Sequence, residues 1–139
     1  MVIVGILLII LALMISVIPQ FTTCESQGKE LTLQNGTTAP MKCYWTGQSE
    51  LVDGLLLLIV GILMIVGKRR ETQLFLSILG VFLGITTILL PTFLIGTCAP
   101  PMLCNTVMKP SLIILGSLVI IDSIVGLAIA IKAKESAQS

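Results

Sequence analysis

The sequence predicts an all-α integral membrane protein, a four-helix bundle built from two parallel helix-loop-helix repeats, and three observations support this class. First, 55% of the 139 residues are hydrophobic, only 11% are charged, and the mean hydropathy is +1.09. Such a chain has too little polar surface to cover a water-soluble globule. Second, the hydrophobic residues gather in four long runs. Third, two polar segments carry the same Met-x-Cys pattern shortly before an apolar run.

The four apolar runs are close to the roughly 20 residues that a membrane-spanning helix needs. They cover residues 2–21, 51–67, 74–96 and 111–131. The second run is short, but the polar residues just before it can lie in the membrane interface. Tyr44 and Trp45 stand there, as expected of an aromatic belt. Four spans are therefore predicted.

The chain is expected to form a single membrane domain over residues 1–139. Repeat one is predicted at 1–67, a cytoplasmic turn at 68–70 and repeat two at 71–134. A cleaved signal peptide is the alternative interpretation of the first run, but that run has no basic segment before it and no A-x-A site after it. The first run is therefore expected to stay as a helix.

The basic residues near the ends of the runs predict the orientation in the cell membrane. Five of them lie in the turn and after the fourth run, and three lie in the other two loops, where glutamates offset them. By the positive-inside rule, both termini are expected in the cytoplasm and the two cysteine loops outside. The five are Lys68, Arg69, Arg70, Lys132 and Lys134, and the three are Lys29, Lys42 and Lys109.

All four cysteines fall in the loops that this topology places outside. Cys24 and Cys43 lie in the first external loop, and Cys98 and Cys104 lie in the second. An even number of cysteines on the oxidising side of a membrane indicates disulfide bonds. Three pairings are possible, and the lower entropic cost of closing short loops favours Cys24 with Cys43 and Cys98 with Cys104.

The two halves of the sequence resemble each other in the order of several residues. Gly5, Pro19, Cys24, Met41 and Cys43 recur in the second half in the same order. Because each half would contain two spans, the second enters the membrane in the same orientation as the first, which makes a parallel repeat. The matching residues are Gly80, Pro91, Cys98, Met102 and Cys104.

Small residues indicate where the helices can approach one another. Gly80 and Gly84 form a GxxxG face in the third run, which allows another backbone to come close. Weaker stripes of small residues come from Ala12 with Ser16 and from Gly54 with Gly61. Pro91 is expected to bend the third helix near its outer end.

Two acidic residues lie in or near the apolar runs. Asp122 is in the middle of the fourth run, where an unpaired carboxylate costs at least about 2.5 to 3.5 kcal/mol on insertion scales. It is expected to face protein, water or a partner, with the hydroxyls of Thr86, Thr87 and Ser123 as candidate partners within the chain. Asp53 is interpreted as an acid at the interface that reaches water.

Several kinds of chemistry are excluded by composition. The chain has no histidine, so histidine-based catalytic triads, histidine metal sites and CxxCH haem attachment are not available. With a net charge of +1 and no basic arm, it also lacks the charge pattern of a nucleic-acid-binding protein. No catalytic residue and no cofactor are assigned.

Two alternatives assign a chemical function to the cysteines. Four spans with a cysteine pair in each external loop resemble quinone-linked thiol oxidases of bacteria, although the CxxC pair and the quinone-contacting arginine of those enzymes have no counterpart here. The second alternative is a Cu(I) site, because thiolate and thioether sulfurs suit that ion. Its ligands would be Met41, Cys43, Met102 and Cys104, with Met108 as a further candidate.

Taken whole, the chain resembles a domain-of-unknown-function family of small four-span prokaryotic membrane proteins. The resemblance rests on MKCYWT and the span that follows it, and on LIGTCAPPMLCNT with Pro110 and the fourth span. It implies a non-catalytic accessory subunit that packs beside the permease of an ABC exporter of the macrolide-exporter type, and hence a role in transport. The longer, polar first loop, residues 25–38, departs from that pattern.

Overall fold

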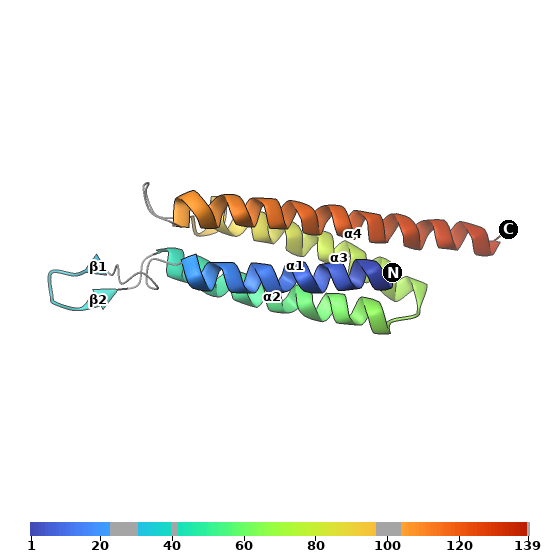
Figure 1. Ribbon diagram of the computed structural model, residues 1–139, viewed down its shortest axis with the longest axis horizontal. Helices are drawn as coiled ribbons and strands as arrows, with labels where there is room; N and C mark the ends of the chain where they lie inside the picture. Colours follow the sequence, from blue (N-terminus) through green and yellow to red (C-terminus); the bar gives the residue numbers. More distant parts are fainter. Residues whose placement is uncertain (23–30, 40–41, 97–103, 139) are drawn as a thin grey trace.

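The computed structural model describes residues 1–22, 31–39, 42–96 and 104–138. Four long helices run side by side, and each is long and apolar enough to cross a membrane (Figure 1). The predicted class, an all-α bundle of four spans, is confirmed. The helices are α1 (Val2–Thr22), α2 (Lys42–Val66), α3 (Arg70–Leu89) and α4 (Lys109–Gln138).

Shorter elements lie between these helices. A π-helical turn, η2 (Leu90–Leu94), continues α3, and a second one, η3 (Cys104–Met108), leads into α4. Two strands of two residues each, β1 (Leu31–Thr32) and β2 (Thr38–Ala39), pair antiparallel between α1 and α2. They extend beyond the end of the bundle (Figure 1).

Three helices extend beyond at least one end of the apolar runs that predicted them. The second begins at Lys42 rather than at residue 51, the third begins at Arg70, and the fourth continues to Gln138. A helix satisfies its own backbone hydrogen bonds, so polar residues can extend it as long as their side chains find protein or water. As a result, residues 48–50 form part of α2, and their location in the membrane interface stays a prediction.

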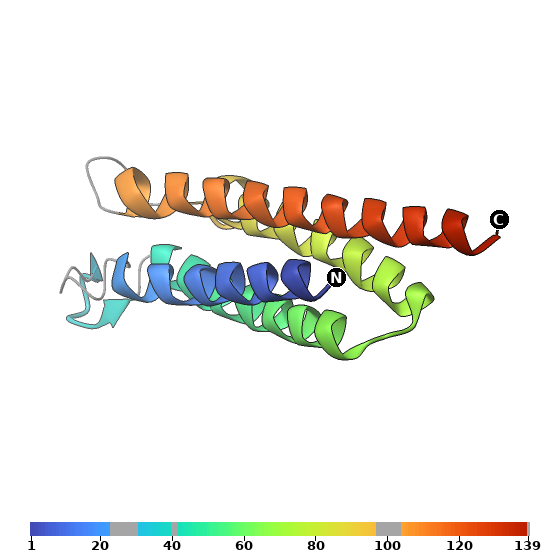
Figure 2. The same ribbon diagram turned by 45° about the vertical axis from the view of Figure 1, so that its right-hand side comes forward.

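The helices pair into two hairpins. The largest interhelical contacts join α1 to α2 and α3 to α4, and smaller ones join α2 to α3 and α1 to α4. Both views show this arrangement (Figures 1 and 2). The two chain ends lie toward one end of the bundle, here called the terminal end, and the β1–β2 hairpin lies at the other, the loop end. Which end faces the cytoplasm remains a prediction from the distribution of charge.

Small residues lie where each hairpin is closest. A Cβ atom added to Gly54 would lie 3.0 Å from the carbonyl oxygen of Ala12 in α1, and it would clash with the Ser16 hydroxyl. In the second hairpin, a Cβ added to Gly116 would lie 3.0 Å from the carbonyl oxygen of Gly84. Such near-contact of backbones needs residues without side chains, and lipid-embedded helices gain van der Waals energy from it. Gly84 of the GVFLG motif therefore lies at the α3–α4 contact.

Gly80, the other glycine of this motif, faces a side chain rather than a backbone. A Cβ added there would lie 2.5 Å from the Ser123 hydroxyl oxygen. The Gly80 position therefore leaves room for Ser123 of α4, which is fully buried. Both glycines face α4, as their spacing of four residues requires.

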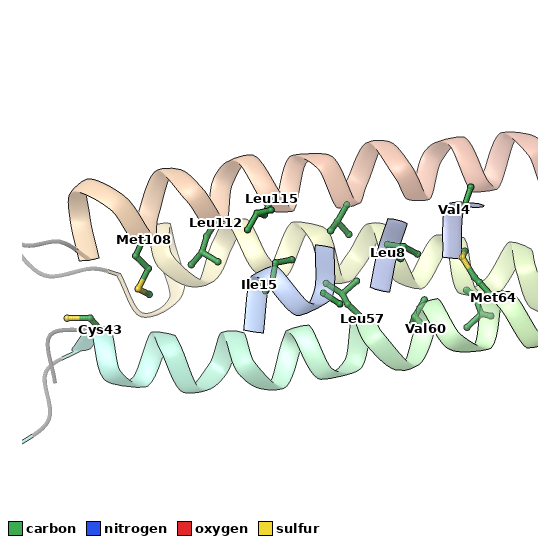
Figure 3. Packing of buried hydrophobic residues seen from close by; sticks show 13 residues of the cluster. Val4, Leu8, Ile15, Cys43, Leu57, Val60, Met64, Met108, Leu112 and Leu115 are labelled. Carbon is green, nitrogen blue, oxygen red and sulfur yellow. The ribbon is translucent and has the colours of Figure 1, made fainter. Parts of the chain in front are cut away.

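The interior of the bundle is filled by aliphatic and sulfur-containing side chains from all four long helices and from η3 (Figure 3). Leu8, Ile15, Leu57 and Leu112 are fully buried there. The outward faces are also apolar, and Ile3 and Phe75, for example, are about three-quarters exposed. A bundle with an apolar exterior matches a lipid environment, in which exposed aliphatic groups cost nothing.

Pro91 lies where α3 departs from regular α-helical geometry. Proline has no N–H to donate, and its ring collides with the carbonyl group four residues earlier. The chain responds with the wider turn η2, in which the Ile95 N–H donates to the Leu90 carbonyl oxygen at 3.1 Å. The effect of Pro91 is therefore a change of helix type at the loop end of α3.

We predict that Gly54→Val lowers the stability of the bundle. The new side chain would meet the Ala12 backbone, which cannot move aside, and overpacking of this kind costs about 1 to 3 kcal/mol. Leu55→Val is the matched control, because Leu55 is 53% exposed on the outer surface of the same helix. Thermal unfolding in detergent should show a lower midpoint for Gly54→Val alone. Equal midpoints would mean that the close approach contributes no stability.

Candidate functional site

Polar side chains form a buried row along one face of α2. Thr46, Glu50 and Asp53 are spaced four and three residues apart, which places them on the same side of a helix. Thr46 and Glu50 are fully buried, and Asp53 is 4% exposed. A row of buried polar groups is unusual in a span whose remaining buried residues are glycine or apolar, so this face is the candidate site.

Asp53 is tied to the neighbouring helix α3. The Thr87 hydroxyl donates to Asp53 Oδ2 at 2.6 Å, and the same hydroxyl lies 3.0 Å from the Leu83 carbonyl oxygen on its own helix. A hydroxyl has only one hydrogen to donate. We assign it to the Asp53 oxygen, because that contact is the shorter of the two and a carboxyl oxygen is a strong acceptor. Asp53 lies near the middle of α2 and is buried against protein, and its interpretation as an acid at the membrane interface stays a prediction.

The two threonines predicted as partners of Asp122 form hydrogen bonds elsewhere. Thr87 binds Asp53 instead, and Thr86 donates to the Phe82 carbonyl oxygen of its own helix at 3.0 Å. Ser123 is buried beside Gly80, and no hydrogen-bond partner of its hydroxyl lies among the described residues. The three hydroxyl groups thus do not gather around Asp122.

Glu50 is the residue that sequence reasoning missed. Neither of its carboxyl oxygens has a hydrogen-bond partner within the part of the chain that the structure describes. The carboxyl group interacts electrostatically with that of Asp53, three residues further along α2. The sequence offered one signal for Glu50, namely its helical spacing from Thr46 and Asp53. This spacing was not recognised because Glu50 precedes the apolar run and was not expected to be part of the helix.

Thr46 connects the row to the other hairpin. Its hydroxyl lies 3.0 Å from the Gly96 carbonyl oxygen, just after η2, and 3.3 Å from the Lys42 carbonyl oxygen of its own helix. Gly96 has a φ of 78°, which is the left-handed region that glycine adopts without strain. This contact joins the first turns of α2 to the end of the third span.

Asp53 also lines a groove between α2 and α3. The groove has a volume of about 400 Å³. Glu50, one turn earlier on α2, is not among the residues that line it. The other lining residues are Ser49, Val52, Leu56, Leu83, Thr86 and Leu90.

Asp122 lines a second groove, on the opposite side, between α1 and α4. The groove has a volume of about 380 Å³, and every other lining residue is aliphatic. Asp122 is half-buried, and its Oδ2 atom is buried without a hydrogen-bond partner among the described residues. The aliphatic lining residues are Leu7, Ile10, Leu11, Leu118, Ile121 and Val125.

The predicted sulfur sites are only partly described. Cys43 is fully buried, at the start of α2. Cys24, Cys98, Met41 and Met102 fall in segments that the structure does not describe. The pairings of Cys24 with Cys43 and of Cys98 with Cys104 therefore stay predictions, as does the alternative Cu(I) site.

Comparison with protein families shows which family the chain belongs to. A family described as a domain of unknown function, DUF4418, matches residues 1–129, which is nearly the whole sequence. The chain belongs to the DUF4418 family. The four apolar helices of this DUF4418 member agree with the resemblance to small four-span membrane proteins. No curated protein and no solved structure shows significant similarity to it.

We predict that Thr87→Val destabilises the protein by about 1 to 3 kcal/mol, because it leaves a buried oxygen of Asp53 without its donor. Thr86→Val is the matched control, since the Thr86 hydroxyl bonds only to its own helix. Thr87→Ser should restore most of the loss by returning the hydroxyl. Unfolding midpoints of the three variants in detergent test the bond, and similar midpoints for Thr87→Val and Thr86→Val would contradict it.

The local disulfide pairings predict a specific peptide map. Digestion of the non-reduced protein should release one linked peptide pair with Cys24 and Cys43, and another with Cys98 and Cys104. Mass spectrometry before and after reduction identifies both. A peptide that links the first loop to the second would show that the cross-loop pairing is the correct one.

Proposed function

We propose that the protein is a non-catalytic accessory subunit that docks against a transmembrane helix of a larger membrane complex. The docking surface is the groove between α1 and α4 at Asp122. The observation that carries the proposal is the buried Oδ2 atom of Asp122, which has no hydrogen-bond partner among the described residues and lies in an otherwise aliphatic groove.

Because of the position of Asp122, the groove between α1 and α4 lacks a polar partner for a carboxyl group inside the membrane. It lies near the middle of the span Asn105–Ala133, where neither water nor lipid headgroups reach. A carboxyl group at this depth costs at least about 2.5 to 3.5 kcal/mol unless it has a polar neighbour. Acyl chains cannot donate a hydrogen bond, so lipid in the groove does not remove this cost.

The occupant that fits is a helix with a lysine or arginine side chain at mid-depth. Its charge complements Asp122, and its apolar flanks complement the six aliphatic residues of the groove. A second copy of this chain lacks the complementary charge, because no lysine, arginine or histidine lies within the four apolar runs. Two copies related by a two-fold axis at the groove would instead place two carboxyl groups together.

The class of the larger complex is proposed from the resemblance. An ABC-type export permease is the partner that the resemblance implies, and export is then the process in which the subunit takes part. A docking subunit requires no catalytic group of its own. Identifying the protein that supplies the bound helix tests whether the partner is an ABC-type permease, and this test is separate from the test of docking.

We predict that a photo-crosslinking amino acid at Ile121, in the groove, captures one partner protein in native membranes. The same amino acid at Leu55 is the control, because Leu55 is exposed on α2 and lines neither groove. Adding Asp122→Leu to the Ile121 probe should abolish the cross-link, since Leu removes the charge that the partner pairs with. Asp122→Asn should weaken it, because an amide accepts a hydrogen bond but carries no charge.

The cross-linked products separate the competing explanations. A product of twice the mass of the chain would identify self-association, and cross-links to lipid alone would leave the groove without a protein partner. Either result contradicts docking. If the purified protein also oxidised a dithiol with a quinone as acceptor, the thiol-oxidase alternative would replace the proposal.

A further inference from the structure

The two hairpins pack in a common register, which allows their cores to be compared. Aligning Pro19 with Pro91 places Ala12 at the position of Gly84. The close contact of Ala12 with Gly54 then corresponds to the contact of Gly84 with Gly116. This register is taken from the close contacts of the packed helices, and it differs by one residue from the sequence alignment of Cys43 with Cys104.

In this register the polar row of the first hairpin corresponds to an apolar row in the second. Glu50 corresponds to Leu112 and Asp53 to Leu115, and both leucines are buried. Thr46 likewise corresponds to the buried Met108. The bundle therefore fills these positions with aliphatic or thioether side chains where no carboxyl group is needed, so packing alone does not explain Glu50 and Asp53.

No cationic group compensates the two acids in the part of the chain that the structure describes. Helix α1 carries no ionisable side chain, and the two in α3, Arg70 and Glu71, lie in its first turn at the terminal end. On α4, Lys109 stands at the first residue, Asp122 lines the other groove, and the remaining charged residues lie in the last turns at the terminal end, namely Lys132, Lys134 and Glu135. Lys42, at the start of α2, is exposed and lies two turns from Glu50. None of these donates a hydrogen bond to a Glu50 oxygen.

The enclosure of Glu50 limits what can neutralise it. Both of its oxygens are buried, so no water-sized space adjoins them. A metal ion with its ligand shell needs such space, whereas a proton does not. Asp53, by contrast, reaches the α2–α3 groove and shares an electrostatic interaction with Glu50.

We infer that Glu50 and Asp53 form a proton-binding site in the membrane interior, in which Glu50 holds the proton and Asp53 exchanges it through the α2–α3 groove. The hydrogen bond from Thr87 holds the Asp53 side chain in place. Proton relays built from acidic side chains are a recognised use of intramembrane carboxyl groups. The site is separate from the Asp122 groove, so it does not depend on the docking partner.

The test is infrared spectroscopy of the full-length protein in liposomes at neutral pH. A protonated carboxyl group gives a carbonyl stretching band that a carboxylate lacks. We expect this band in the unmodified protein, and we expect it to shift when the glutamates carry a ¹³C-labelled side-chain carboxyl. Glu71 and Glu135 are exposed, which leaves Glu50 as the only buried glutamate among the described residues.

Variants assign the band and the exchange route. Glu50→Gln should remove the glutamate band, whereas Asp122→Asn, the control in the opposite groove, should keep it. Asp53→Asn should keep the band but slow its shift in D₂O by roughly tenfold or more, because a positioned carboxyl group accelerates proton transfer. A purely structural role of Asp53 would leave the exchange rate unchanged.

Three results would overturn the inference. The first is the absence of a glutamate band at neutral pH in the labelled, unmodified protein, a measurement that needs no folded variant. The second is a band that disappears when sodium chloride replaces a salt of a bulky organic cation, since that identifies a metal-cation site. The third is an unchanged exchange rate in Asp53→Asn, which would remove Asp53 from the route.

Discussion

The near-contact of backbones within each hairpin is the constraint on which the other features depend. Lipid supplies no hydrophobic force that brings helices together, so their association relies on van der Waals contact and on hydrogen bonds between them. Ala12 with Gly54, and Gly84 with Gly116, let the two helices of each hairpin approach until backbone atoms nearly touch. This fixes the rotation of α2 about its axis and turns Glu50 and Asp53 inward rather than toward lipid.

The acids of this protein lie in two different environments as a result. Asp122 lines a groove that is open at the surface, so its missing partner can come from another molecule. Glu50 is enclosed by the bundle itself, so only a group that needs no space can reach it. A carboxyl group without a hydrogen-bond partner among the described residues thus indicates a contact surface at Asp122 and an internal site at Glu50.

The sequence was sufficient to predict the four spans and the small-residue contacts, because both depend on local composition and on a spacing of four residues. It was not sufficient to predict the partner of Asp53. Whether Thr87 faces Asp53 or Asp122 depends on the relative rotation of the helices, which hydrophobic residues on every face leave undetermined. Glu50 was missed for a different reason, namely that the apolar run marks the lipid-exposed part of α2 and not where the helix begins.

The distribution of acids between the helices also bears on how the chain enters the membrane. Helix α1 contains no ionisable side chain, so its transfer from the translocon into lipid is favourable on its own. Helix α2 carries two carboxyl groups, each of which opposes insertion by about 2.5 to 3.5 kcal/mol when exposed to lipid. Contact with α1 removes part of α2 from lipid, which makes insertion as a hairpin more favourable than insertion helix by helix. The apolar first helix therefore lowers the free-energy cost of placing the more polar second helix in lipid.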